Sequence, residues 1–364
     1  MTTPSRPPAR ILEITSYPPP RAGWGIRVEY LKHRLEAEGH TCTVLNLGTS
    51  RTIPSPEYET VLGGGDFVTK VWRFSRAGYL VHVHASGDAV KGTVLAVIGS
   101  LISLLHGRRP VLTFHAGATQ RHFPVHRSWT WTPLYGLLFA LQRQIICNSD
   151  AVKVCIQQYG VPASKIVPIP AFSAQYLEFT PQALPPQLEA FYQRYPQTVF
   201  VYVRLRKLFY PLTLVEGIAT MCAARPDIGV VLCGAYGGHF EPEIREAFDR
   251  RIAELQLADR VCILEDLDHD SFLTALKRSV LYLRTPITDG VASSVLESIA
   301  LGTPVVACEN GSRPRGVVLY PAEDPERMAA AVLHTIDHRA EVMAAQADLE
   351  VRDTLADEVA LLTR

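Results

Sequence analysis

The chain has 364 residues, 47% of them hydrophobic and 20% charged, and its 36 basic residues balance its 36 acidic residues. This length suits two globular domains of roughly 150 to 200 residues each, and the zero net charge argues against a protein that binds nucleic acid over its whole surface. Seven scattered cysteines without a C-x-x-C pair indicate buried reduced thiols. The polar start does not look like a signal peptide and no apolar run is long enough to span a bilayer, so we expect a cytoplasmic protein.

The first half of the chain alternates apolar strand-like runs with amphipathic stretches at helical spacing. A strand, a glycine-containing loop and a helix at the beginning are typical of a Rossmann-like domain. We expect strands over 10–15, 41–47, 79–84, 110–117 and 144–149, helices over 26–38, 94–105 and 151–159, and a flexible loop over 63–66.

The loop over 16–25 is rich in proline and glycine. It contains Gly23 and Gly25 but lacks the third glycine of a dinucleotide-binding fingerprint. The loop is therefore either a plain tight turn or part of a ligand site.

One histidine lies where α/β proteins place their ligands. His115 falls at the carboxyl end of a predicted strand, and it is either a site residue or a loop histidine satisfied by backbone groups. The other histidines nearby are weaker candidates, and no two of them have zinc-ligand spacing on an evident helix, so we predict no metal site. These weaker candidates are His82, His84, His122 and His126.

A group of aromatic and apolar residues follows in the same half. Burial in the core is the simpler explanation, because such side chains are usually buried. The alternative is a surface that contacts lipid at the inner face of a membrane, beside neighbouring arginines. The group consists of Trp129, Trp131, Leu134, Leu137 and Leu138.

The second half repeats the alternation of strands and helices. A stretch rich in proline, glutamine and aromatic residues at 180–196 predicts a linker and the first helix of a second domain. We expect strands over 198–203, 228–234, 261–264 and 279–284 and from 305 onward, and helices over 212–224, 271–276 and within 324–364.

Three cations follow the strand predicted at 198–203, namely Arg204, Arg206 and Lys207. Cations at the carboxyl end of a strand suit a diphosphate group, and a solvated basic loop is the alternative. Gly234 ends the next strand and opens a loop of small residues that could approach a base or a phosphate.

The most informative stretch, 284–307, has the pattern strand, turn, helix, turn, strand. Its turn over 290–294 consists of Gly290, Val291, Ala292, Ser293 and Ser294, which are small enough to let a phosphate reach the N-terminus of the helix, where Ser293 and Ser294 can supply capping oxygens. Asp289 and Glu297 flank this turn, and ribose or hexose hydroxyls are natural partners for carboxylates. The alternative is an ordinary buried βαβ unit with a capping Asp and an exposed Glu.

Seven residues separate Asp289 from Glu297. The run D-G-x-x-S-S-V-L-E-S-x-A-x-G-T-P-V-V-A resembles the E-x7-E signature of retaining GT-B glycosyltransferases, specifically glycosyltransferase family 4, with Asp in place of the first Glu. The flanking segments 284–286 and 313–319 are similar to the bacterial polysaccharide and glycoconjugate branch of that family. Weaker similarity extends over 144–170 and 198–234.

The resemblance implies an α/β fold of the GT-B type, with two Rossmann-like domains facing across an inter-domain cleft. We expect an acceptor domain over 1–178 that is completed by a C-terminal helix over 345–364, and a donor domain over 179–344. The D-x-D run at 266–268 resembles a metal-binding motif of the other glycosyltransferase fold, GT-A. We reject that role because Asp270 is well explained as the N-cap of the following helix.

The resemblance also implies a function. The chain would be a retaining hexosyltransferase of polysaccharide biosynthesis, without a metal or other cofactor, that moves a sugar from a nucleoside-diphosphate sugar to a glycan or lipid-linked acceptor. UDP-sugars are the commonest donors of the family, and no nucleic-acid partner is implied.

The family's functional positions map onto this chain with two departures. Its glycine pair in the first loop begins with Ala22 here, and its phosphate-binding Lys-Gly is replaced by Tyr210-Pro211, so Lys207 or Arg206 would substitute. The implied roles are ribose binding by Glu297, diphosphate binding by the 290–294 backbone, charge neutralisation by Arg204 and Lys207, contacts with the donor sugar by Asp289 and His115, and an acceptor side at Gly23 and Gly25.

Two other interpretations remain open. A GT-B sugar phosphorylase or epimerase would share the architecture but need other active-site residues. A catalytically degenerate nucleotide-binding protein is suggested by Asp289 and by the missing lysine.

Overall fold

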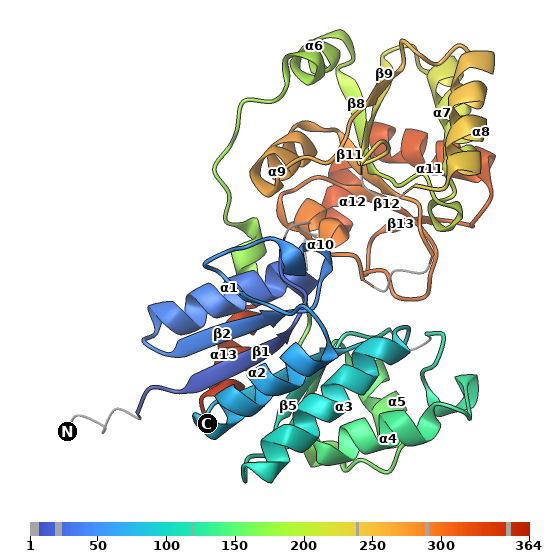
Figure 1. Cartoon of the computed structure of the whole chain (residues 1–364). Coiled ribbons are helices and arrows are strands. Elements are labelled where there is room, and N and C mark those ends of the chain that lie inside the picture. Colours follow the sequence, from blue (N-terminus) through green and yellow to red (C-terminus); the bar gives the residue numbers. More distant parts are fainter. Residues whose placement is uncertain (1–6, 19–23, 118–119, 238–239, 288–290, 347–350) are drawn as a thin grey trace. The chain divides into compact units, whose positions relative to one another are not determined.

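The computed structural model describes residues 7–18, 24–117, 120–237, 240–287, 291–346 and 351–364. The chain forms two compact units, one of Met1–Gln175 with Asp353–Arg364 and one of Tyr176–Arg352 (Figure 1). Each unit is a parallel sheet covered by helices, so the two Rossmann-like domains expected for a GT-B fold are confirmed.

The sheet of the first unit has seven parallel strands in the order β3-β2-β1-β4-β5-β6-β7. The order reverses direction between β1 and β4, and in such sheets ligands bind beyond the carboxyl ends of the strands. The strands are β1 (Arg10–Thr15), β2 (Thr41–Asn46), β3 (Glu59–Thr60), β4 (Leu80–Ala85), β5 (Val111–Phe114), β6 (Gln144–Cys147) and β7 (Ile166–Pro168). The helices are α1 (Trp24–Ala37), α2 (Gly64–Arg76), α3 (Val90–Leu105), α4 (Thr132–Leu141), α5 (Asp150–Gln157) and α13 (Thr354–Leu362).

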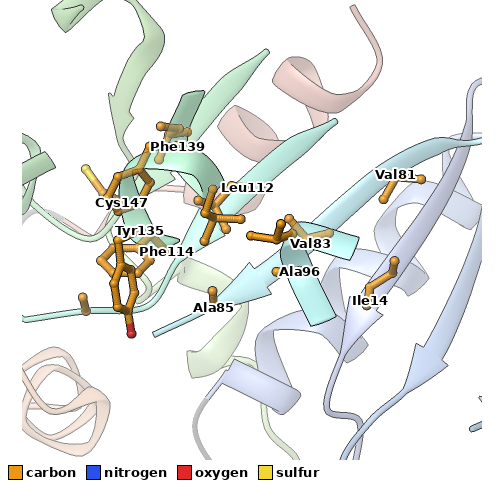
Figure 2. Packing of buried hydrophobic residues seen from close by; sticks show 14 of the residues in the cluster. Ile14, Val81, Val83, Ala85, Ala96, Leu112, Phe114, Tyr135, Phe139 and Cys147 are labelled. Carbon is orange, nitrogen blue, oxygen red and sulfur yellow. The ribbon is translucent and has the colours of Figure 1, made fainter. Parts of the chain in front are cut away.

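Alternation along the central strands divides their side chains between two cores. Ile14 of β1 and Val83 of β4 belong to the core that includes Tyr135 of α4 (Figure 2). Ile11 of β1 and Val111 of β5 belong to the opposite core, together with residues of α1 and α13. Every second residue of these strands therefore lies beneath α1 and α13.

The start of α2 corrects one expectation. Residues 63–66 were expected to form a flexible loop, but α2 begins at Gly64. Phe67 and Val71, one helical turn apart, are 1% and 0% exposed. Burying this apolar face outweighs the unfavourable helix propensity of glycine, which is about 1 kcal/mol per residue.

The second unit has six parallel strands in the order β10-β9-β8-β11-β12-β13. Successive residues of β8 enter different cores: Val201 lies with Leu214 of α7 and Met328 of α11, whereas Phe200 lies with Leu273 of α9. The strands are β8 (Gln197–Tyr202), β9 (Ile228–Cys233), β10 (Val261–Ile263), β11 (Leu281–Arg284), β12 (Val305–Cys308) and β13 (Val318–Tyr320). The helices are α6 (Pro186–Arg194), α7 (Pro211–Ala224), α8 (Pro242–Glu254), α9 (His269–Arg278), α10 (Ser293–Ala300), α11 (Pro325–Asp337) and α12 (Arg339–Gln346).

The helix expected after the D-x-D run is present as α9, but its cap differs from the prediction. Asp268 has extended backbone angles, and its carboxylate accepts a hydrogen bond from the Ser271 N–H at 3.0 Å. Asp270 was expected to be the N-cap, which is wrong, because it lies inside the first turn. Its carboxylate instead accepts a hydrogen bond from the Thr180 N–H at 3.3 Å.

A buried ion pair fixes the last helix, α13, to α1 of the first unit. Arg27 of α1 and Glu358 of α13 are 3% and 0% exposed. The Arg27 Nε donates to the Glu358 carboxylate at 2.7 Å, and its Nη1 donates to the Ala171 carbonyl at 2.7 Å. Each charge therefore depends on the other for compensation.

We expect Arg27→Met to lower the free energy of unfolding by about 3–5 kcal/mol, because it leaves the buried carboxylate of Glu358 without its charge partner. Urea denaturation followed by circular dichroism measures this loss. Arg34→Met is the control, since Arg34 lies on the same helix and its ion pairs with Glu38 and Asp353 are half-exposed, so their loss should cost about 1 kcal/mol or less. Equal stability of the two variants would contradict a structural role for the Arg27 pair.

Candidate active site

The predicted site residues of the second unit follow three adjacent strands. In the sheet, β8 lies between β9 and β11, and all three run parallel. Arg204 comes after β8, Gly234 after β9 and Val291 after β11. Because the strand order reverses between β8 and β11, these residues meet at the edge where doubly wound sheets bind ligands.

Arg204 connects the loops that follow three strands. Its Nη1 donates to the carbonyl oxygens of Gly234 at 3.2 Å and Gly237 at 2.6 Å, and its Nη2 lies 2.8 Å from Asp266 Oδ1. The binding of a phosphate by Arg204 stays a prediction. The ion pair with Asp266 partly compensates the charge of Arg204, and this pairing was not predicted from the sequence. One signal was available, because Asp266 closely follows β10, the neighbour of β9.

Gly234 is required by the backbone of this region. Its φ of +81° lies in the left-handed range, and a Cβ there would come within 3.0 Å of the Tyr202 ring and 3.3 Å of the Val203 carbonyl oxygen. A side chain would therefore be both strained and obstructed. The loop after β9 can approach the loop after β8 this closely only with glycine at position 234.

The two other predicted cations are exposed. Arg206 Nε lies 3.8 Å from Glu241 Oε1, and the other oxygen of this carboxylate accepts a hydrogen bond from the Lys207 backbone N–H at 3.3 Å. No partner of the Lys207 ammonium is found in the part of the chain that the structure describes. Lys207 is thus the cation of this group with the least compensated charge.

Among the described residues, none provides a side-chain cap at the start of helix α10. Ala292 is the N-cap residue, and Ser293 and Ser294 lie inside the helix, so they do not occupy the expected capping position. The Ser294 hydroxyl instead forms a hydrogen bond with the Tyr282 hydroxyl at 2.8 Å. Val291 before the helix is 49% exposed. An uncapped helix N-terminus keeps N–H donors and a partial positive charge that favour an anion.

Glu297 lies in the second turn of α10 and is 7% exposed. Among the described residues, no hydrogen bond or ion pair to its carboxylate is found. Burial raises its pKa from the ordinary 4.5 to about 8. A buried carboxylate without a partner is costly, and such groups cluster at functional sites.

Three predicted site residues lie outside the described part of the chain. They are Asp289, Gly290 and Gly23.

On the first unit, α1 begins at Trp24, earlier than the expected helix over 26–38, so Gly25 lies in its first turn rather than in a loop. The Trp24 ring packs against the ring of His115, with centroids 4.4 Å apart. His115 follows β5 directly and is partly exposed. Its pKa is lowered well below the ordinary value by burial, and further by the positive charges near it.

His115 ends a buried chain of hydrogen bonds that the sequence analysis missed. Its Nε2 lies 2.8 Å from His84 Nδ1, His84 Nε2 lies 2.8 Å from one Glu13 oxygen, and the other Glu13 oxygen lies 2.9 Å from His82 Nδ1. The sequence signal was the spacing of two between His82 and His84 on a strand, which places both on one face.

Glu13, His82 and His84 also have the ligand types and proximity of a metal site, since their ligand atoms lie within 4.8 Å of one another. Zinc-ligand spacing on a helix does not predict this grouping, because His82 and His84 lie on a strand, β4. All three side chains are buried. The contacts between them have the lengths of hydrogen bonds.

The aromatic group of the first unit is divided between core and surface. Leu138 is buried, and Trp131 and Leu134 pack partly buried against the core. Trp129 and Leu137 are 78% and 44% exposed. Among the described residues, no helix combines the length and apolar character needed to cross a membrane.

Family comparisons agree with the two-domain fold. Residues 22–172 match the model of Glycosyltransferase Family 4, and residues 191–340 match that of Glycosyl transferases group 1. The two matches cover one Rossmann-like domain each. The chain is therefore a glycosyltransferase and belongs to the GT-B class.

Solved structures share the fold over nearly the whole chain. HepE from Anabaena in complex with UDP-glucose superposes with a TM-score of 0.67 at 16% identity, covering 97% of this chain and 96% of that one. A glycosyltransferase from Rickettsia africae gives 0.68 at 15% identity, covering 98% and 96%. Sucrose-phosphate synthase from Thermosynechococcus elongatus gives 0.63 at 17% identity, covering 98% and 95%. No protein with a curated description matches the sequence significantly.

The raised pKa of Glu297 makes a prediction about pH. Its folded-state pKa of about 8 exceeds the ordinary 4.5. Below about pH 4.5 the side chain is neutral in both the folded and the unfolded protein, and the free energy of unfolding is at its full value. This free energy falls as the pH rises from 4.5 through 8, because the folded protein must then bury a charged carboxylate. Glu297→Gln keeps a neutral group at all pH values. We expect it to be more stable than the wild type by roughly 3–5 kcal/mol at pH 9 and nearly equal at pH 5.

Urea denaturation of both proteins at the two pH values measures this difference. Glu326→Gln, at an exposed position in the first turn of α11, is the matched control and should show no such change. A gap between wild type and Glu297→Gln that is the same at both pH values would contradict the buried, unpartnered carboxylate.

Proposed function

We propose that this glycosyltransferase transfers a sugar with retention of configuration from a UDP-sugar to a glycan or lipid-linked acceptor. The observation that carries the proposal is Glu297, a buried carboxylate without a partner among the described residues, on a helix whose N-cap residue, Ala292, has no capping side chain. A carboxylate without a described partner and the N–H groups at the start of the same short helix suit the ribose and the diphosphate of a single nucleotide.

The donor site follows from this pairing. Glu297 accepts hydrogen bonds from the ribose hydroxyls, and the backbone N–H groups over 290–294 bind the diphosphate. Lys207, whose ammonium is exposed, neutralises the leaving phosphate, with Arg206 and Arg204 beside it. Electrostatic stabilisation of that leaving group is the largest contribution we assign to the protein.

Other residues act on the sugar and the acceptor. Asp289 accepts hydrogen bonds from donor-sugar hydroxyls, and His115 lines the sugar and acceptor side together with Gly23 and Gly25. UDP is the proposed nucleotide because HepE, a protein of the same fold, is known in complexes with UDP and with UDP-glucose.

The proposed reaction needs no protein nucleophile. The acceptor oxygen attacks the anomeric carbon on the face that the diphosphate leaves, the bond from that carbon to the phosphate oxygen breaks, and the leaving phosphate takes the acceptor proton. The anomeric configuration is retained. No metal ion takes part, because the cations at the carboxyl end of β8 carry the charge compensation.

We also propose that the enzyme acts in polysaccharide or glycoconjugate assembly in the cytoplasm and contacts the inner face of the membrane. Trp129 and Leu137, which are 78% and 44% exposed, are amphipathic and apolar groups suited to the lipid interface.

Donor binding is tested by thermal shift with UDP, GDP and their sugars. We expect UDP to raise the melting temperature, because a ligand of the folded state stabilises it by mass action. Glu297→Ala should weaken UDP binding by about 10- to 100-fold through loss of its hydrogen bonds to the ribose hydroxyls, whereas Glu326→Ala should bind as the wild type does. Equal affinity of both variants would remove Glu297 from the site.

Turnover is tested by hydrolysis of UDP-glucose in excess EDTA. We expect the rate to be unchanged by the chelator, and early NMR spectra to show that the released glucose has the α configuration of the donor. UDP binding without release of sugar would indicate a degenerate nucleotide-binding protein. Loss of activity in EDTA that added Mg²⁺ restores would contradict the metal-independent reaction.

A further inference from the structure

The proposed reaction leaves unexplained a set of polar side chains buried beneath α1 and α13. Glu13, His82 and Thr113 are 0%, 0% and 2% exposed, and His84 is 8% exposed. Strand pairing places Glu13 opposite His82, and His84 opposite Thr113. Four polar groups in the interior of a Rossmann-like sheet are costly unless each is hydrogen-bonded.

These groups form one continuous chain of hydrogen bonds. In addition to the contacts between Glu13 and the two histidines, His82 Nε2 lies 2.8 Å from the Thr113 hydroxyl, and this hydroxyl donates to Glu358 at 3.3 Å. Glu358 in turn accepts from Arg27. The chain therefore extends from a buried ion pair to His115, which is partly exposed at the carboxyl end of β5.

The direction of each hydrogen bond can be worked out from the available protons. An ionised Glu13 only accepts, so His82 and His84 must both donate to it. A neutral His84 has then used its one proton on Nε2, and its Nδ1 is an acceptor. The neighbouring His115 Nε2 must therefore carry the proton that it donates to His84.

The surroundings of Glu13, His82 and His84 favour a definite charge state for each of them. Burial would raise the pKa of Glu13, but the charge and the hydrogen bond of His82, with the hydrogen bond of His84, lower it to about 2. Burial works against protonation of His82, yet Glu13 raises its pKa above the ordinary value. Burial, and then the charge of His82, lowers the pKa of His84. An ionised Glu13, a charged His82 and a neutral His84 fit these directions.

We propose that Glu13, His82 and His84 are positioning residues that hold His115 as the tautomer protonated on Nε2, so that its Nδ1 is a hydrogen-bond acceptor for a sugar hydroxyl. The contact with sugar rests on the proposed function of His115, whereas the tautomer does not. The ring of Trp24, 4.4 Å away, restricts the imidazole further. His115 then accepts from the substrate and does not donate to it.

The tautomer is tested on the full chain by NMR of histidines labelled with ¹⁵N, with His115→Asn to assign the signals. At neutral pH we expect a protonated Nε2 and an unprotonated Nδ1 on His115, and two protonated nitrogens on His82. A His115 protonated on Nδ1 or on both nitrogens would overturn the proposal. So would a stoichiometric metal ion in the purified protein, since Glu13 and both histidines would then be its ligands.

Two substitutions of His84 separate its two hydrogen bonds. The side-chain amide of Asn reaches the place of Nδ1 and can still accept from His115, whereas that of Gln reaches the place of Nε2 and bonds with Glu13 only. We expect the His115 tautomer to persist in His84→Asn and to become a mixture in His84→Gln. Thr113→Val is the control. It removes the hydrogen bond between His82 and Thr113, which lies on the side of Glu13 away from His84, and should leave the His115 tautomer unchanged.

Hydrolysis of UDP-glucose supplies the functional test. His84→Gln should lose about tenfold in kcat/KM, the value of one hydrogen bond, and His84→Asn should retain most of it. An altered tautomer without any loss of turnover would show that the network is real but His115 does not contact the sugar. No turnover of UDP-glucose by the wild type would exclude glucose as the donor sugar, while the NMR spectra would still decide on the tautomer.

Discussion

Parallel pairing of all strands is the constraint on which the rest of this structure depends. It brings the carboxyl ends of the strands to one edge of each sheet. In the second unit that edge gathers the loops of β8, β9 and β11, and in the first unit it places His115 beyond β5. Parallel sheets also need both faces covered by helices, so the side chains of their central strands are buried whether they are apolar or not.

Glu13 and Glu297 are both buried carboxylates, but their surroundings compensate the cost of burial to different degrees. Glu13 is surrounded by hydrogen-bond donors, and His82 and His84 hold its pKa at about 2 although burial alone would raise it. Glu297 has no partner among the described residues, and burial raises its pKa to about 8. The first carboxylate is satisfied within the protein and serves its organisation. The second is unsatisfied, which is the expected state of a group whose partner is a ligand.

Much of the local structure could be predicted from the sequence. Apolar runs of strand length predict β1, β2, β4 to β6 and β8 to β12, whereas the short strands β3 and β7 give no such signal, and the pattern from Arg284 to Ala307 predicts the end of β11, α10 and β12 together with a turn of small residues. The wrong predictions concern positions where two local signals favour different structures. The glycines at 63–65 predict a loop, but burial of Phe67 and Val71 on one face makes α2 begin at Gly64. A cap was given to Asp270 when Asp268, two residues earlier, has the extended backbone that a cap requires.

The sequence by itself determined the alternation of strands and helices, the glycosyltransferase signature around Glu297 and the small residues of its turn, because these features depend on neighbours along the chain. Only the tertiary structure decided which polar groups meet. Glu13 reaches His82 across 69 positions, and Arg27 reaches Glu358 across 331. Such contacts depend on strand register and on helix docking, which no local pattern encodes. The burial of Glu297 and the ion pair of Arg204 with Asp266 were decided in the same way.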